Sequence, residues 1–345
     1  MRGRLAIVLV LGAAAFTVAL QGQQGTHLNP LVDLLKNGQV VIGTSAPSLP
    51  RAGGGGGRRA GGAAGADATP TPTPSPTPAA PVRTNADLAK DTLAHPEIDY
   101  FFSGSMEGSV DPGLPAFTAY QDALAAVGPL TTSGPRRLRA PLSVKTPKIS
   151  TNPENAIPNV SKQLNAGVAA ISFVHVDTAK ELEQGISAMR FASKGGTRPE
   201  AIGDAPKYWG LTEKEYREKA DVWPLNPNGE LLAWAIIETP EGIANLREII
   251  HVKGLSAIII GAGTLRGVFT NTVDGQRVRD EVAWEAANQK ILATCKEFKM
   301  PCGFPAYATD IEERYKQGFR VFIIQAFNES GFQAVEIGRK LAGRK

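Results

Sequence analysis

The sequence predicts an α/β fold, a (β/α)8 TIM barrel, from three observations. Eight apolar runs of strand length alternate with helical stretches. The chain has 345 residues, more than the roughly 250 that one such barrel needs. No Gly-x-Gly-x-x-Gly turn follows the first strand, and this disfavours the structural alternative, a doubly wound open sheet.

The predicted elements begin before a low-complexity segment and continue after it. Residues 29–45 predict a helix with Leu31, Leu34 and Leu35 on one face, then a turn, then a strand at 40–43. The other predicted strands are 98–102, 142–145, 169–174, 231–237, 255–261, 301–306 and 320–326. The clearest helices between them are 178–191, 240–252, 278–298 and 309–317.

Two segments are predicted to lie outside the barrel. Residues 1–20 have two arginines, an apolar stretch and then small residues, which is typical of a secretory signal. We therefore expect an exported protein, periplasmic or secreted, with an uncleaved N-terminal anchor as the alternative. Residues 46–83 combine a glycine run with a Thr-Pro repeat, which predicts a disordered insertion. The expected organisation is one barrel domain, 27–345, interrupted by 46–83.

Charge and cysteine usage exclude two classes of function. The formal net charge is +4, but the excess arginines lie in the N-terminal segment and the insertion: Arg2, Arg4, Arg51, Arg58, Arg59 and Arg83. The remainder is not basic, so we expect no nucleic-acid partner, and no membrane contact beyond the N-terminal segment. Cys295 and Cys302 are seven residues apart with no histidine beside them, which excludes a metal knuckle and leaves a disulfide open.

In a (β/α)8 barrel, functional side chains lie at the carboxyl ends of the strands. Glu238 ends an apolar strand there, which predicts a divalent-metal ligand or an acid/base group, because a buried carboxylate needs a compensating partner. The alternative is a helix cap, a role that Thr239 can fill alone. The other strand-end groups are Ser45, residues 103–108, Lys145, His175, residues 261–264, Tyr307, Asn328 and Glu329.

Three of these strand ends carry titratable groups with open roles. Lys145 can present a cation to a substrate oxygen or remain a solvated lysine. His175 can be a ligand or a structural hydrogen-bonding residue. Glu107 and Asp111 lie in a turn rich in glycine and serine, where an acid/base residue would be well placed and where ordinary loop chemistry is the alternative.

Several stretches resemble the HpcH/HpaI aldolase and citrate-lyase-like family. They are "NPLVDLLKNGQVVIGT", "VHVDTAKELEQGISAMRFASKGGTRP", "IIETPEGIANLREIIHVKGLSAIIIGAGTL" and "GFRVFIIQAFNES". The resemblance implies a barrel of the phosphoenolpyruvate/pyruvate type and a homo-oligomer. It also implies a lyase that cleaves or forms a carbon–carbon bond beside a metal-stabilised enolate of a small 2-oxo or hydroxy acid.

The resemblance also implies roles for individual residues. Glu238 falls on the family's metal-binding Glu, and Thr264 on its metal-binding Asp, so a site for Mg²⁺, Mn²⁺ or Co²⁺ would keep half of its carboxylate pair. Lys145 falls on the substrate-binding Arg. Glu107 lies one residue from the position of the general-base His and is expected to act as the base. The "GAGTL" turn implies substrate contacts at Gly261, Gly263 and Thr264.

One alternative to the lyase follows from these substitutions. Lys for Arg loses a bidentate fork, and loss of the histidine removes a base that contributes about 10²–10⁴ in rate. The chain could therefore be a barrel that binds a small acid without aldol chemistry or with a different reaction. A third reading is a structural protein of the cell envelope, with residues 46–83 as a spacer.

Overall fold

Eight parallel strands close into a barrel in the computed structural model, which describes residues 27–47 and 83–344. Their order is β1-β2-β3-β4-β6-β7-β10-β11, and pairing of β11 with β1 and of β4 with β6 closes the sheet. The strands are β1 Val41–Ser45, β2 Tyr100–Ser103, β3 Leu142–Thr146, β4 Ala170–Phe173, β6 Leu231–Ile237, β7 Leu255–Ile260, β10 Cys302–Ala306 and β11 Val321–Ile324. The predicted (β/α)8 fold is confirmed.

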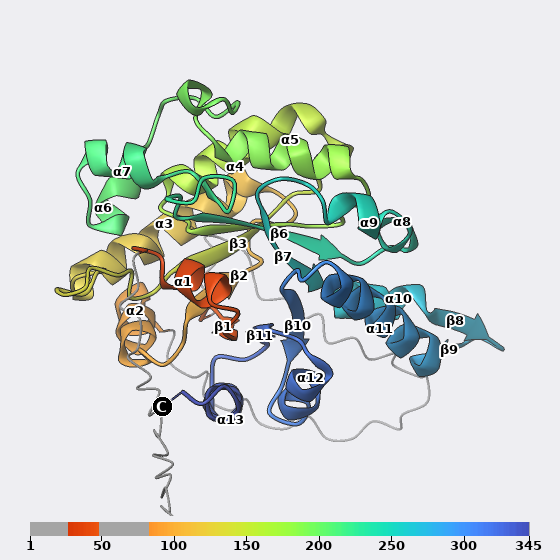
Figure 1. Cartoon of the computed structure of the whole chain (residues 1–345). Coiled ribbons are helices and arrows are strands. Elements are labelled where there is room, and N and C mark those ends of the chain that lie inside the picture. The colour runs from red at the N-terminus through yellow and green to blue at the C-terminus, as the bar shows by residue number, and fades with distance from the viewer. Residues whose placement is uncertain (1–26, 48–82, 345) are drawn as a thin grey trace, which may run out of the picture.

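Helices follow the barrel strands and form an outer layer (Figure 1). Those that connect successive strands are α2 Asn85–Ala94, α3 Val110–Val127, α4 Ala156–Asn165, α5 Ala179–Met189, α8 Pro240–Ala244, α9 Leu246–Ile249, α10 Ala262–Val268, α11 Glu281–Glu297 and α12 Ile311–Gln317, and α13 Glu329–Leu341 follows the last strand. Additional short elements are α1 Pro30–Lys36, η1 Ile149–Thr151, η2 Pro153–Asn155, η3 Ala192–Lys194, α6 Ala205–Trp209, α7 Glu213–Lys219 and β5 Val222–Trp223. Capping boxes at Thr84, Thr178 and Thr212 fix the starts of α2, α5 and α7.

The predicted N-terminal signal, 1–20, and most of the predicted insertion, 46–83, lie outside the described residues. The division of the chain into these segments therefore stays a prediction. Among the helices of residues 27–47 and 83–344, none has both the length and the apolar character needed to cross a bilayer. Cys295 and Cys302 are both buried and free.

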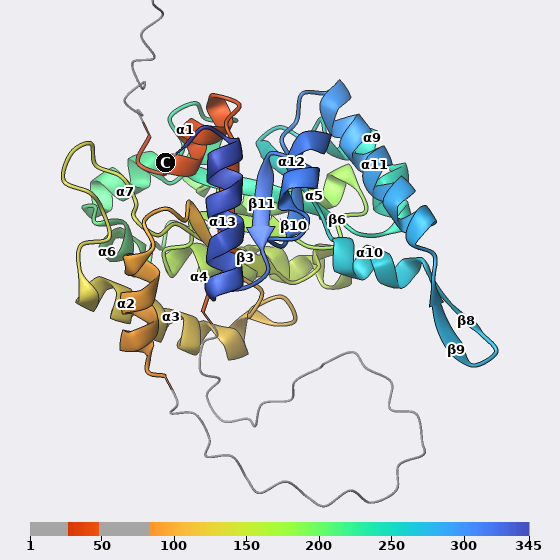
Figure 2. The same cartoon turned by 90° about the horizontal axis from the view of Figure 1, so that it is seen from below.

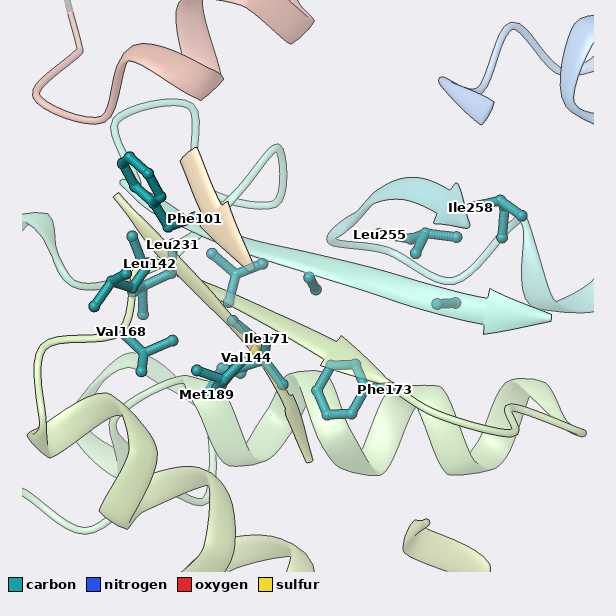
Figure 3. Packing of buried hydrophobic residues seen from close by; sticks show 14 of the residues in the cluster. Phe101, Leu142, Val144, Val168, Ile171, Phe173, Met189, Leu231, Leu255 and Ile258 are labelled. Atoms are coloured by element: carbon teal, nitrogen blue, oxygen red, sulfur yellow. The ribbon is translucent and has the colours of Figure 1, made fainter. Parts of the chain in front are cut away.

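The core has two layers, one between the strands and the helices and one inside the barrel. Figure 3 shows part of the outer layer, where Val144, Ile171 and Phe173 of the sheet pack with Met189 of α5. The inner layer includes Tyr100 and Trp234, whose rings meet edge to face at 5.1 Å. Side chains thus fill the barrel interior, and the remaining space for a ligand is at its ends.

Alternation along the strands determines which residues reach the open end of the barrel. In β6, Leu232, Trp234 and Ile236 belong to the inner layer, while the residues between them belong to the outer layer. The same period of two places Glu238 on the inward-facing side, one step beyond Ile236. Lys145 of β3 also lies on the inward-facing side of its strand, because the preceding residue, Val144, packs in the outer layer.

A hairpin that the sequence did not predict projects from the barrel between α10 and α11 (Figure 2). Its strands are β8 Thr270–Val273 and β9 Gln276–Arg279, which corrects the predicted helix 278–298: the helix begins at Glu281. The turn residues Asp274 and Gly275 both have positive φ, of 50° and 78°, as a type I′ turn requires. The sequence signal was the Asp-Gly pair, and the predicted helix overlapped the end of β9.

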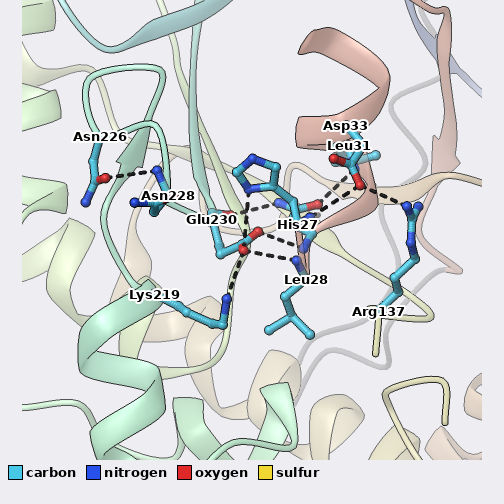
Figure 4. A network of polar contacts seen from close by, with 10 residues as sticks. His27, Leu28, Leu31, Asp33, Arg137, Lys219, Asn226, Asn228 and Glu230 are labelled. Atoms are coloured by element: carbon cyan, nitrogen blue, oxygen red, sulfur yellow. Dashed lines mark hydrogen bonds and ion pairs between the residues drawn. The ribbon is translucent and has the colours of Figure 1, made fainter. Parts of the chain in front are cut away.

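A polar network fixes α1 against the rest of the chain (Figure 4). Glu230, whose side chain is 1% exposed, accepts hydrogen bonds from the backbone N–H groups of Leu28 and Asn29 at 3.0 and 2.9 Å. Lys219 Nζ and His27 Nδ1 lie 3.4 and 3.5 Å from the same carboxylate. The apolar face of α1 belongs to the inner core layer, so this network keeps one end of the barrel covered.

Replacing Glu230 by alanine is expected to lower the free energy of unfolding by about 2–5 kcal/mol, because two buried backbone donors lose their acceptor. Chemical denaturation followed by circular dichroism measures this change. The matched control is Glu248→Ala at an exposed position of α9, where a change within about 0.5 kcal/mol is expected. Equal stability of the two variants would contradict a structural role for the network.

Candidate active site

Glu238 is buried at the carboxyl end of β6 and does not cap the next helix. Thr239 fills that role, because its hydroxyl oxygen accepts a hydrogen bond from Gly242 N at 3.0 Å. The Glu238 carboxylate is 1% exposed, and its Oε1 accepts a hydrogen bond from the backbone N–H of His175 at 3.0 Å. Of the two interpretations that the sequence left open for Glu238, the cap is therefore excluded.

Gly261, at the end of β7, makes room for this carboxylate. A Cβ atom at Gly261 would lie 2.4 Å from Glu238 Oε2, closer than two such atoms can approach. The resemblance implied a substrate contact at Gly261, and the structure places the Glu238 side chain beside this glycine. The close approach fixes where the carboxylate lies and requires glycine at this position.

His175 follows β4 and brings an imidazole to Glu238. Its Nδ1 lies 3.5 Å from Glu238 Oε1, and its side chain is 33% exposed. The backbone of His175 has φ 47°, in the left-handed region that a non-glycine residue rarely occupies. This conformation lets both the backbone N–H and the ring of one residue meet the same carboxylate.

Residues just beyond His175 support the turn. Asp177 binds Lys148 Nζ at 2.7 Å and also accepts a hydrogen bond from the Thr239 hydroxyl. The hydrogen bond to Asp177 raises the pKa of Lys148. The side chain of Asn245 donates to the backbone carbonyl of Asp177 at 2.8 Å. Contacts to segments that follow β3 and β6 therefore hold the residues after β4 in place.

Glu107 and Lys145 form an ion pair at the same end of the barrel. Lys145 Nζ lies 3.0 Å from each carboxylate oxygen of Glu107. Glu107 belongs to the turn between β2 and α3, and Lys145 to the end of β3, whose backbone carbonyl at Lys145 accepts from Gln163 of α4 at 2.8 Å. The turn after β2 therefore places the Glu107 carboxylate beside Lys145, the residue expected to bind substrate.

We call Glu107, Lys145, His175 and Glu238 the mouth cluster. One ligand atom from each of Glu107, His175 and Glu238 lies within 4.8 Å of the other two. Two carboxylates and an imidazole are donors suited to Mn²⁺, Co²⁺ and similar divalent ions. Glu238 is a buried carboxylate with no lysine or arginine within 4.0 Å among the described residues, and a cation would offset the cost of its burial. The residues present therefore fit a metal ion.

The structure places the other predicted residues apart from these contacts. Thr264 and Gly263 lie on the first turn of α10, and both are exposed. Thr264 makes no hydrogen bond to Glu238. Asp111, at the start of α3, pairs with Lys162 of α4. His175, whose role the sequence left open, lies beside Glu238, and its positive φ has no sequence signal.

Comparisons with known proteins bear on this site. The family model of HpcH/HpaI aldolase/citrate lyase matches residues 143–330, a range that contains Lys145, His175 and Glu238. A curated relative, the 2-dehydro-3,6-dideoxy-6-sulfogluconate aldolase of Pseudomonas putida, is 25% identical over 161 residues. That alignment covers 46% of this chain and 58% of the relative, so somewhat more than half of the relative's length is matched.

Solved structures share the fold at low sequence identity. A HpcH/HpaI aldolase/citrate lyase family protein from Burkholderia cenocepacia has a TM-score of 0.58 and 17% identity, with 91% of this chain and 98% of the other covered. A HpcH/HpaI aldolase from Desulfitobacterium hafniense has a TM-score of 0.55 and 14% identity, with 90% and 95% covered. Because the family model matches more than half of the sequence, the chain belongs to the HpcH/HpaI aldolase/citrate lyase family.

Proposed function

We propose that the protein is a carbon–carbon lyase of the aldolase type, acting on a 4-hydroxy-2-oxo acid and releasing pyruvate or a related 2-oxo acid. The observation that carries the proposal is the mouth cluster, in which an ion-paired lysine and carboxylate adjoin a buried carboxylate and an imidazole. The family and the aldolase activity named for the Pseudomonas putida relative support it.

Glu238 and His175 would hold the divalent cation, with Glu107 within reach of the same ion. When bound, the cation supplies Lewis-acid stabilisation of an enolate oxygen. The buried position of Glu238, fixed by the His175 N–H and by Gly261, preorganises the ligand before metal and substrate arrive.

Lys145 and Glu107 would handle the substrate. An ammonium group has three N–H donors, and two contacts to Glu107 leave one donor for a substrate carboxylate or oxo group. Glu107, 38% exposed, is accessible to take the proton of the 4-hydroxyl group. As that proton leaves, the C3–C4 bond breaks, C4 becomes an aldehyde, and the electron pair passes to C3 and the 2-oxo oxygen. Glu107 would then return this proton to C3, which completes the 2-oxo acid, and by the reverse step it would remove a C3 proton from pyruvate.

Exchange of the pyruvate methyl protons in D2O tests this function without knowledge of the aldehyde. We expect the methyl signal in proton NMR to disappear with enzyme and Mn²⁺, to persist after chelation, and to disappear again when the metal is restored. Exchange reports removal of a C3 proton, the half of the reaction that every substrate would share. Absence of exchange with Mg²⁺, Mn²⁺ and Co²⁺, together with no pyruvate release from a panel of 4-hydroxy-2-oxo acids, would favour a barrel that binds acids without aldol chemistry.

A further inference from the structure

A polar cavity of about 410 Å³ adjoins the mouth cluster on the side of Glu107. Its walls come from the start of α3, from the segment after β3 and from the first turns of α4. Helices α3 and α4 contact each other. Glu107 lines both the cavity and the mouth cluster, and Thr146 in the wall directly follows Lys145. A ligand whose reacting carbon lies at Glu107 can therefore extend into this space.

The charged groups of the wall are balanced. Glu107 is paired with Lys145, Asp111 with Lys162, and Lys148 with Asp177. No wall cation is left without an acidic partner, so the cavity offers no free positive charge to an anionic ligand tail. Its few apolar side chains, those of Pro147, Ile149, Ala156 and Pro158, do not form the broad apolar surface that an aromatic group requires.

Three asparagines are among the polar side chains of the wall that have no hydrogen-bond partner in the described residues. Asn155 and Asn159 are four residues apart at the start of α4, which places them on one face. Asn152 precedes η2 and lines the same cavity. Asn155 is the cap residue of α4, yet its side chain makes no cap hydrogen bond. None of the three amides makes a side-chain hydrogen bond to a residue that the structure describes. Each therefore offers both a donor and an acceptor to a ligand.

We propose that this cavity binds the aldehyde half of the substrate and selects a short, neutral, polyhydroxylated aldehyde of three or four carbons. The inference rests on the proposed function. A hydroxyl group both donates and accepts hydrogen bonds, as the amide does, so three amides that line one cavity suit a chain of adjacent hydroxyls. In the synthetic direction a proton leaves C3 of pyruvate, C3 bonds to the aldehyde carbon, and the aldehyde oxygen takes up a proton, so no further reactant is needed.

Competing aldehydes test the selection in wild-type enzyme with pyruvate and Mn²⁺. Glyceraldehyde and propanal have the same three-carbon chain with and without hydroxyls, glyceraldehyde 3-phosphate adds an anionic tail, and benzaldehyde is aromatic. We expect kcat/KM for glyceraldehyde to exceed that for each of the others by about tenfold or more, the effect of one or two hydrogen bonds. Equal values, or a preference for the phosphorylated, apolar or aromatic aldehyde, would overturn the proposal.

Substitution of Asn155 by leucine links the selection to the wall. We expect the ratio of kcat/KM for glyceraldehyde to that for propanal to fall about tenfold, and this ratio is independent of the folded fraction. The matched control is Asn271→Ala on exposed β8, which should keep the wild-type ratio. An unchanged ratio in Asn155→Leu and in Asn152→Ala would overturn the assignment of the cavity. Pyruvate exchange without aldehyde preference would refute this inference alone, whereas no exchange would refute the proposed function and the inference with it.

Discussion

Replacing Glu238 by glutamine is expected to weaken Mn²⁺ binding by more than about 100-fold and to abolish metal-dependent exchange of the pyruvate methyl protons. Changes to groups that only support a metal ligand already cost about 10- to 100-fold in affinity, and Glu238 is proposed as the ligand itself. Glutamine keeps an oxygen that can accept from His175 N, so the local fold is expected to persist. Isothermal titration with Mn²⁺ and the NMR exchange assay measure the two effects.

Glu241→Gln is the matched control for this variant, because Glu241 is an exposed carboxylate in the first turn of α8, three residues after Glu238. It should retain both the metal affinity and the exchange rate. Circular dichroism and the thermal midpoint establish that the Glu238 variant is folded. A folded Glu238→Gln protein that binds Mn²⁺ as tightly as wild type would remove Glu238 from the metal site.

Replacing Glu107 by glutamine is expected to lower the exchange rate by about 10²–10⁴, the usual contribution of a general base. The amide keeps the size of the side chain but cannot accept a proton. Because Glu107 is more exposed than Glu238 and already paired with Lys145, we expect the loss of Mn²⁺ affinity to be much smaller than in Glu238→Gln. Exchange rates at saturating Mn²⁺ separate the two roles.

Two outcomes would contradict this role for Glu107. A loss of metal affinity as large as that of Glu238→Gln, with exchange recovered at high Mn²⁺ concentration, would make Glu107 a ligand and leave the base elsewhere. An exchange rate equal to that of wild type would remove Glu107 from the reaction. Glu241→Gln again gives the reference for a carboxylate outside the mouth cluster.

The periodicity of the sequence predicted the barrel well because each barrel strand is a short apolar run bounded by a turn or a helix. The period of two along β6 also explains why Glu238, one step beyond Ile236, faces the interior. The hairpin was missed because its strands are exposed except at Thr270, so they carry no apolar pattern. Only the Asp274-Gly275 turn marked it in the sequence.

The site was predicted less completely because its geometry depends on backbone conformation and on contacts between distant segments. Strand ends alone identified Lys145, Glu238 and the turn that contains Glu107, and the resemblance then implied that Glu107 acts as the base. The contacts of His175 with Glu238 depend on a positive φ at His175. No local sequence pattern indicates this conformation for a histidine. Lys145 and Glu107 are 38 positions apart in the chain, and the parallel pairing of β2 with β3 brings them within hydrogen-bonding distance.

The central claim is that Glu238 and His175 hold a divalent cation beside Glu107 and Lys145. Anomalous diffraction at the manganese edge, from crystals of the wild-type protein grown with Mn²⁺, tests it most directly. The account predicts a single strong peak within about 2.0–2.3 Å of a Glu238 carboxylate oxygen and a His175 ring nitrogen. Crystals whose anomalous map has no peak at these residues, with Mn²⁺ bound elsewhere or nowhere, would contradict it.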